Sequence, residues 1–282
     1  MLLDKPPGIT SARAVSLVKR LLPKRTKVGH TGTLDPLASG LLVILIGRAT
    51  RLSRYVTGLD KAYVATARFG AASDTLDAEG EILEEAGPIP PEAELRRALP
   101  DFTGEVSQMP PMASAVKVGG RRLYELHRRG MEVEREPRRV RIHSLELLSF
   151  DPPAATFAIR CSSGTYVRSL IADLASSLGT AAYLTALRRT HVGHLLLEDA
   201  LPPERLDPST LHNRIILPAR VLSHLPALEA DEERVRAVAA GRPLRVAEGL
   251  EGSFRVQRDG ELLAVYRARG GRARPEVVLC GG

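Results

Sequence analysis

One carboxylate, Asp35, lies in a glycine-bracketed loop, residues 29–40, and an apolar run from Leu41 to Ile46 follows it. The preceding segment is densely basic and contains Lys19, Arg20, Lys24, Arg25 and Lys27. A single acid beside a positive surface indicates chemistry on an anionic polymer. Asp followed by Pro is also typical of a helix start, with the Asp side chain as N-cap. On this pattern alone, Asp35 is either a helix cap or a catalytic group.

The loop as a whole is more informative than its Asp-Pro pair. Its sequence, GHTGTLDPLASG, resembles the active-site motif of the TruB-type tRNA pseudouridine synthases, G-H-T-G-x-L-D-P-x-A-x-G, at every fixed position. In that family the loop carries the only catalytic aspartate, which implies that Asp35 is catalytic. Residues 2–8 also resemble the family's opening D-K-P-x-G segment, and motif resemblance extends from Leu3 to about Thr190.

A cation, Arg168, falls in the first turn of a helix predicted over residues 166–178. A positive charge there opposes the helix dipole, so Arg168 is either exposed and screened or offset by a nearby anion. Residues 164–170 resemble the family's G-T-Y-[IV]-R-[ST]-L motif, whose arginine pairs with the catalytic aspartate. The resemblance therefore implies a bidentate pair that holds Asp35 ionised, and it places Tyr166 among the substrate-binding residues.

Two further positions match pocket motifs of the family. Tyr63, on a strand predicted over residues 63–69, matches K-x-Y and is otherwise an ordinary sheet-face aromatic residue. The resemblance implies that Tyr63 stacks on the target uracil and moves a proton late in the reaction. Leu187 matches L-R-R-T and is implied to line the same pocket, although a Leu in the helix predicted over residues 181–188 is otherwise plain core.

His30 and Asp77 each have a plain alternative to the role that the family implies. His30 is a candidate metal ligand or general base, but no Cys or carboxylate lies at metal-ligand spacing from it. The family implies that this histidine enters the RNA stack where the target base leaves. Asp77 lies in a segment that resembles D-T-x-D-x-x-G and is implied to order the site. A solvated acidic loop is the alternative.

The segment from Gln108 to Gly130 resembles the family's Q-x-P-P-x-x-S-A-x-K-x-x-G-x-x-L-Y motif, an insertion that clasps the T arm of tRNA, and this insertion is predicted over about residues 107–141. Nine basic residues face four acidic ones between residues 117 and 141, and Lys117 and Arg121 are predicted phosphate contacts. Residues 119–126 are predicted to lead into a basic, amphipathic turn of helix. The motif often continues with A-R-x-G, whereas this chain has LHRRG at residues 126–130, which leaves the RNA contacts there open.

The remaining pattern predicts an α+β fold with a mixed, largely antiparallel sheet. A catalytic domain is predicted over residues 1–225, and a small β-rich domain that resembles a PUA-type RNA-binding domain over 226–282. The second domain is predicted to hold a helix at residues 228–240 and a hairpin that turns at residues 258–261. Other expected elements are a helix from Thr10 or Ser11 to Pro23 and strands at 140–150 and 156–161.

Composition limits the classes of protein that fit. The 282 residues are 44% apolar with a net charge of +7, and residues 1–60 hold ten Lys or Arg against three Asp or Glu. No apolar run approaches the ~20 residues that span a bilayer, and no signal peptide is evident. Cys161 and Cys280 make neither a disulfide framework nor a metal site. We therefore expect a cytoplasmic monomer without an obligate protein partner or a membrane association.

The resemblance implies isomerisation of uridine 55 to pseudouridine in the T-arm stem-loop of tRNA, with the base flipped out and without metal or other cofactor. The aspartate attacks C1′, adds to the base or removes a sugar proton, and the sequence leaves these routes open. A non-catalytic RNA-binding or tRNA-folding protein on the same scaffold is the alternative. A retaining glycosidase would need a second carboxylate about 5 Å away, which no motif supplies.

Overall fold

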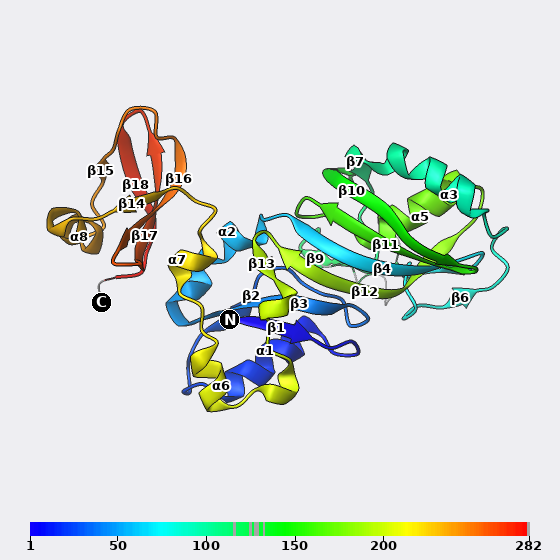
Figure 1. Cartoon of the computed structure of the whole chain (residues 1–282), viewed down its shortest axis with the longest axis horizontal. Coiled ribbons are helices and arrows are strands. Elements are labelled where there is room, and N and C mark those ends of the chain that lie inside the picture. Colours follow the sequence, from blue (N-terminus) through cyan, green and yellow to red (C-terminus); the bar gives the residue numbers. More distant parts are fainter. Residues whose placement is uncertain (115–116, 124–125, 127–129, 132, 281–282) are drawn as a thin grey trace.

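The computed structural model describes residues 1–114, 117–123, 126, 130–131 and 133–280. Its described strands form a nine-stranded sheet, a five-stranded sheet and two short hairpins. Figure 1 shows the five-stranded sheet, coloured orange to red, beside the large sheet, with α2 and α7 between them. Within these ranges, no helix combines the length and the apolar character that crossing a membrane requires.

The large sheet has the order β1-β3-β12-β4-β11-β10-β7, with β2 on β3 and β13 on β12. Only β12 and β3 pair in parallel, so the predicted α+β fold with a mixed, largely antiparallel sheet is confirmed. Its strands are β1 (Leu2–Lys5), β2 (Val28–His30), β3 (Ser39–Ile46), β4 (Lys61–Phe69), β7 (Gly104–Gln108), β10 (Arg138–Asp151), β11 (Ala154–Cys161), β12 (Ala182–Val192) and β13 (Leu195–Leu196).

Strand β12 replaces a helix that the sequence predicted over residues 181–188, and that prediction is wrong. The segment is short and apolar, so its periodicity does not separate a buried strand from a buried helix. Its environment decides, because β12 lies between β3 and β4 and each neighbour supplies backbone partners. Tyr183, Thr185 and Val192 suit such a pleated, half-buried surface.

Two helices cover the face of the sheet on which Ala65, Ala67 and Phe69 of β4 lie. Helix α1 (Ser11–Arg20) begins where Thr10 Oγ1 accepts a hydrogen bond from the Arg13 N–H at 3.1 Å. Helix α5 (Val167–Ser177) contributes Leu170, Ile171 and Leu174 to the same core. This core includes Ala65, Ala67 and Phe69 of β4, as their alternation in the sequence predicted.

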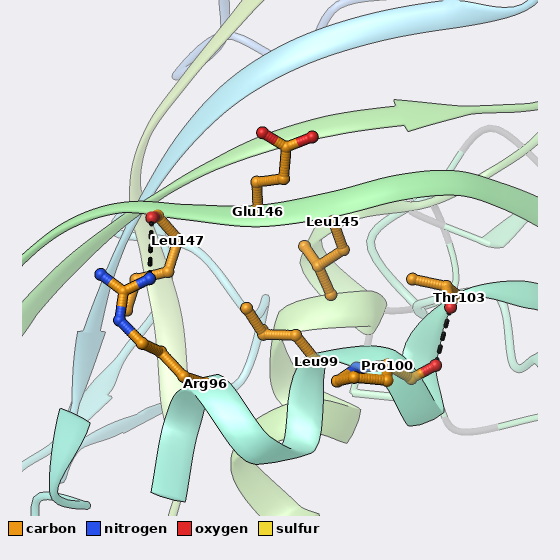
Figure 2. Close-up of a pocket in the computed structure, with 7 residues that line it drawn as sticks. All are labelled: Arg96, Leu99, Pro100, Thr103, Leu145, Glu146 and Leu147. Atoms are coloured by element: carbon orange, nitrogen blue, oxygen red, sulfur yellow. Dashed lines mark hydrogen bonds between the residues drawn. The ribbon is translucent and has the colours of Figure 1, made fainter. Parts of the chain in front are cut away.

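On the same layer, α3 (Glu92–Ala98) and η2 (Leu99–Phe102) lie along β10. Figure 2 shows the shallow groove between them, where Leu99 faces Leu145. The Arg96 guanidinium bridges this groove by donating to the Leu147 carbonyl at 3.4 Å. None of the residues predicted to carry chemistry lines this groove.

The C-terminal sheet has the order β14-β16-β17-β18-β15 and its own core around Phe254 and Tyr266. The helix predicted over residues 228–240 is shorter than expected, because strand β14 precedes α8. The predicted hairpin turn is present, with Arg258 paired to Glu261. These elements are β14 (Ala227–Glu229), α8 (Glu232–Ala239), β15 (Leu244–Arg245), β16 (Gly252–Arg258), β17 (Glu261–Arg269) and β18 (Arg272–Val278).

The two sheets share a second core cluster, because Leu41 and Val43 of β3 pack in one cluster with Val265 and Val277 of the C-terminal sheet. The remaining elements are connections: η1 (Gly47–Leu52), α2 (Ser53–Thr57), β5 (Ala72–Ser73), β6 (Ile82–Leu83), β8 (Lys117–Val118), β9 (Arg121–Arg122), η3 (Leu197–Asp199), η4 (Pro203–Arg205), α6 (Pro208–Asn213) and α7 (Pro218–Val221).

Candidate active site

Asp35 lies in the loop that joins β2 to β3, and no helix follows it. The helix-cap interpretation of the Asp-Pro pair is therefore wrong. Ser11 of α1 fixes the loop from one side, since its Oγ accepts from the Leu34 N–H at 2.8 Å and donates to the Leu34 carbonyl at 2.9 Å. The Asp35 side chain is 39% exposed, so its carboxylate is held by the fold and remains accessible to a ligand.

Arg168 is only 5% exposed and contacts two carboxylates. Its Nη2 lies 2.9 Å from Asp35 Oδ2, and its Nη1 lies 3.1 Å from Asp77 Oδ2. The same two nitrogens donate to the carbonyls of Thr75 and Ala113, each at 2.8 Å. Arg168 therefore pairs with Asp35 as expected, but through one nitrogen, and the expected bidentate geometry is wrong. Two anions offset the cation in the first turn of α5.

Asp77 is buried, so it is not part of a solvated acidic loop. Its Oδ1 accepts from Thr75 Oγ1 at 2.7 Å and from the Glu79 N–H at 3.1 Å. Its Oδ2 is then free to face Arg168. A carboxylate fixed in this way orients the guanidinium, which in turn contacts Asp35.

Burial raises the pKa of Asp35 above its ordinary value, and the Arg168 guanidinium offsets that rise only in part. The neighbouring Asp77 carboxylate raises this pKa further, whereas the Lys5 ammonium lowers it. The sequence predicted a pair that simply keeps Asp35 ionised. In the structure, burial and the Asp77 carboxylate raise the pKa of Asp35, while the Arg168 and Lys5 cations lower it.

Lys5 was not singled out from the sequence, although the segment that contains it matched the family's opening motif. Its side chain is fully buried, and Nζ donates to the carbonyls of Pro6, Ile9 and Pro36. Burial lowers the pKa of Lys5 to about 8. The ammonium thus ties the N-terminal strand to the residue that follows Asp35.

Tyr63 and Leu187 lie on neighbouring strands of the sheet. Leu187 of β12 pairs with Ala65 of β4, two residues from Tyr63, and both side chains contact the same core. Tyr63 is half-buried, and burial raises the pKa of its phenol, while the Arg189 guanidinium lowers it. Ala65 next to these residues is fully buried in this core, so the space that the sequence predicted for a planar ring stays a prediction.

His30 ends β2 and is half-buried. Its Nδ1 is buried and has no hydrogen-bond partner within the described ranges. Burial lowers the pKa of His30, and the Arg189 cation lowers it further, so the neutral imidazole is favoured at pH 7. No group of three His, Cys, Asp or Glu side chains with metal-site geometry occurs among the residues that the structure describes.

Tyr166 precedes α5 and is fixed through its backbone. Its N–H donates to Gln108 Oε1 at 2.7 Å, and its carbonyl accepts from Gln108 Nε2 at 3.0 Å. Gln108 ends β7, so this pair of bonds joins the start of the insertion to the start of α5. Gln108 had been noted only as part of the insertion motif.

Lys117 and Arg121 lie on the two strands of the hairpin β8–β9, where Lys117 pairs with Arg122 and Val118 with Arg121. Their side chains lie outside what the structure describes, as does most of the helical turn into which residues 119–126 were predicted to lead. Their predicted phosphate contacts stay predictions.

Known proteins match this chain along almost its whole length. The profile of the TruB family pseudouridylate synthase, N-terminal domain, matches residues 19–167. A tRNA pseudouridine synthase B from Azoarcus sp. (strain BH72) is 42% identical over 99% of this chain and 94% of its own. Another from Burkholderia mallei (strain NCTC 10247) is 43% identical over 100% of this chain and 97% of its own. A chain of the archaeal box H/ACA sRNP Nop10–Cbf5 complex superposes with a TM-score of 0.75 at 25% identity, covering 99% of this chain and 85% of that one.

Proposed function

The chain belongs to the TruB family of pseudouridylate synthases, and we propose that it converts uridine 55 in the T loop of tRNA to pseudouridine. One observation supports this most strongly. A single accessible carboxylate, Asp35, is held by a buried arginine that a second, buried carboxylate orients in turn. Of the described acids near Asp35, Asp77 is buried on Arg168, and Glu79 is exposed. Asp35 is therefore the carboxylate that is both accessible and held by the arginine.

The reaction is an isomerisation, so its atoms balance without a co-reactant. The C1′–N1 bond breaks, the uracil turns, and C1′ forms a bond to C5; the hydrogen lost from C5 is balanced by one gained at N1. Asp35 is the group that acts on the sugar or the base. A carboxylate opposite a sugar carbon is also the device of retaining glycosidases, but here the leaving base is kept and reused.

The other predicted residues take roles around the flipped base. Tyr63 stacks on the uracil and moves a proton late in the reaction, and Leu187 lines the same pocket. His30 occupies the place that the base leaves in the RNA stack. Flipping costs a few kcal/mol, which stacking and phosphate contacts offset. A half-buried tyrosine beside a small alanine supports this arrangement.

Recognition of the T arm is assigned to the basic segments. Lys117 and Arg121 contact phosphates from the insertion, residues 107–141, and the PUA-like unit, residues 226–282, adds a second RNA-binding surface. Tyr166 contacts the substrate beside Arg168. The protein acts in the cytoplasm as a monomer, without an obligate protein partner and without a metal or other cofactor.

A T-arm stem-loop RNA incubated with the protein tests the proposal. Pseudouridine has the mass of uridine, so chemical labelling followed by mapping of the labelled position is the suitable measurement. We expect stoichiometric conversion at the position of uridine 55 and none in an RNA with cytidine there. An RNA that is bound but left unmodified would favour the alternative of a non-catalytic tRNA-folding protein.

A further inference from the structure

Arg189 is the largest side chain that is fully buried in the described structure, with 1% of its surface exposed. It lies on β12, which runs between β3 and β4 (Figure 1). Arg189 is in register with Gly40 of β3 on one side and with Tyr63 of β4 on the other. A guanidinium stays charged at any physiological pH, and burying one without a carboxylate costs free energy. Packing alone therefore does not explain why an arginine is buried at this position.

Three hydrogen bonds of Arg189 go to backbone carbonyls of the Asp35 loop and of β3, and its guanidinium also bonds the phenol of Tyr63. Its Nη2 donates to the Gly32 carbonyl at 3.0 Å, and its Nε donates to the Leu41 carbonyl at 2.8 Å. A longer bond of 3.4 Å joins Nη1 to the Thr33 carbonyl. Within the described ranges Arg189 makes no ion pair with a carboxylate. Its donors therefore join Gly32 and Thr33, which precede Asp35 in its loop, to Leu41 of the following strand β3.

The neighbours of Arg189 show that its charge reaches the rest of the site. The guanidinium lowers the pKa of His30 and offsets the raised pKa of Tyr63. It also contributes to lowering the pKa of Lys61, which burial brings to about 8. One cation thus lies beside the loop of Asp35, beside the tyrosine proposed to stack on the base and beside the histidine proposed to replace it.

We propose that Arg189 is a positioning residue for pseudouridine formation: its planar guanidinium ties the Asp35 loop and the start of β3 to β12, and so sets where Asp35 stands relative to Tyr63. The inference rests on the proposed function. Five N–H donors in one plane match carbonyls that approach from several directions, whereas an ammonium is a single point of charge. The geometry of the fork, rather than its charge, holds the loop.

The decisive variant is Arg189→Lys, because it keeps the buried charge and removes the fork. Arg189→Met is a second variant that removes both. Arg160→Met is the matched control, since Arg160 is exposed on β11 and pairs with Ala62, which places it on the opposite face of the same sheet. Each full-length variant is measured for its melting temperature, its affinity for a T-arm stem-loop and its single-turnover rate at saturating protein.

We expect Arg189→Lys to bind the RNA within a few-fold of wild type and to melt within a few degrees of it, while its single-turnover rate falls about 100-fold. Arg189→Met should fall at least as far, and Arg160→Met should keep the wild-type rate. A Lys variant that reacts at the wild-type rate would overturn the proposal, because charge alone would then suffice. Equal losses in affinity and rate would also overturn it.

Amide hydrogen exchange supplies a readout that does not depend on activity. The Thr31 N–H donates to the Val43 carbonyl at 3.1 Å, and the Leu34 N–H donates to Ser11, so both amides are protected while the loop is held. In Arg189→Lys both should exchange faster, while amides of α5 stay unchanged. Unchanged protection at Thr31 and Leu34 would overturn the proposal. An inactive wild type would refute the proposed function instead, and the exchange result would still decide whether Arg189 holds the loop.

Discussion

Arg168 reaches Asp35 through a single nitrogen, with Nη2 2.9 Å from Asp35 Oδ2, while Nη1 faces a different carboxylate. The guanidinium is therefore shared between the accessible acid and the buried acid Asp77. Shared in this way, it fixes the direction of the Asp35 carboxylate without neutralising it as fully as a bidentate pair would. The pKa of Asp35 is accordingly raised by burial rather than lowered by pairing.

Replacement of the reactive acid is the first test of this site. Asp35→Asn is nearly isosteric and removes only the charge, so we expect the single-turnover rate to fall by about 10⁴-fold or more. Affinity for a T-arm stem-loop should stay within a few-fold, because phosphate contacts dominate binding. Rates are measured by labelling pseudouridine, and affinities by filter binding. Substantial turnover by this variant would remove Asp35 from the chemistry.

The raised pKa of Asp35 predicts the acid side of the pH–rate profile. The reaction needs the carboxylate, and a raised pKa means that the carboxylate is protonated at a higher pH than for an ordinary Asp. The rate should therefore decline on the acid side before ordinary carboxyls titrate, and level off once Asp35 is ionised. Single-turnover rates between about pH 4 and pH 8, with RNA binding checked at each pH, measure this. A rate that stays flat down to the ordinary pKa of Asp would contradict the predicted environment.

Local patterns in the sequence were sufficient for most of the fold. Alternation in residues 63–69 predicted the buried face of β4, and the apolar stripe of residues 166–178 predicted α5. The strand β12 was missed because an Ala- and Leu-rich segment of that length suits either element, and its pairing partners lie more than a hundred residues earlier in the chain. The pairing of this segment with β3 and β4 makes it a strand, which residue propensities alone did not determine.

The candidate site was predictable in its residues but not in its geometry. The family motif predicted that Arg168 pairs with Asp35. No rule based on sequence spacing links these two residues. The role of Asp77 as a second partner of Arg168 required the fold, since a polar loop gives no signal of burial. Lys5 and Arg189 were missed for the same reason: a basic residue in a sequence indicates a surface, and only the structure shows these two among carbonyl oxygens.

The close approach of β3 to β12 predicts that Gly40 is required for stability. Gly40 has a φ of +98°, and a Cβ there would lie 2.3 Å from the Arg189 carbonyl oxygen. Gly249 has the same φ with no atom within 4 Å of a Cβ, so Gly249→Ala reports the backbone strain alone. We expect Gly249→Ala to cost about 1 kcal/mol and Gly40→Ala at least about 2 kcal/mol more in free energy of unfolding, measured by denaturant titration. Equal costs would contradict the predicted clash.

The uneven charge of the chain predicts a salt-dependent interaction with RNA. Residues 1–60 carry ten basic residues against three acidic ones and residues 117–141 nine against four, and each phosphate contact releases counterions on binding. Affinity for a T-arm stem-loop should therefore fall steeply and linearly on a logarithmic salt scale. An uncharged-backbone analogue of the same stem-loop is the control and should lose the slope. A flat salt titration with the native RNA would contradict the assignment of the basic segments.

Substitution of Arg168 separates its charge from its geometry. Arg168→Lys keeps the charge but cannot contact both carboxylates and two carbonyls, so we expect the single-turnover rate to fall roughly 100-fold with little change in RNA affinity. Arg168→Ala should be worse, because it removes two interactions that lower the pKa of Asp35 and leaves Asp77 to raise it. A larger share of Asp35 is then protonated at neutral pH.

The further rise in the pKa of Asp35 determines how the rate of Arg168→Ala depends on pH. As the pH increases through the new, higher pKa, Asp35 regains its charge, so the rate of Arg168→Ala should recover in part at pH values where the wild-type rate has already levelled off. Arg160→Met, on the opposite face of the sheet, serves as the control and should follow the wild-type profile. If both Arg168 variants instead react like wild type at every pH, the guanidinium neither orients nor ionises Asp35, and the reactive carboxylate must be held by the loop alone.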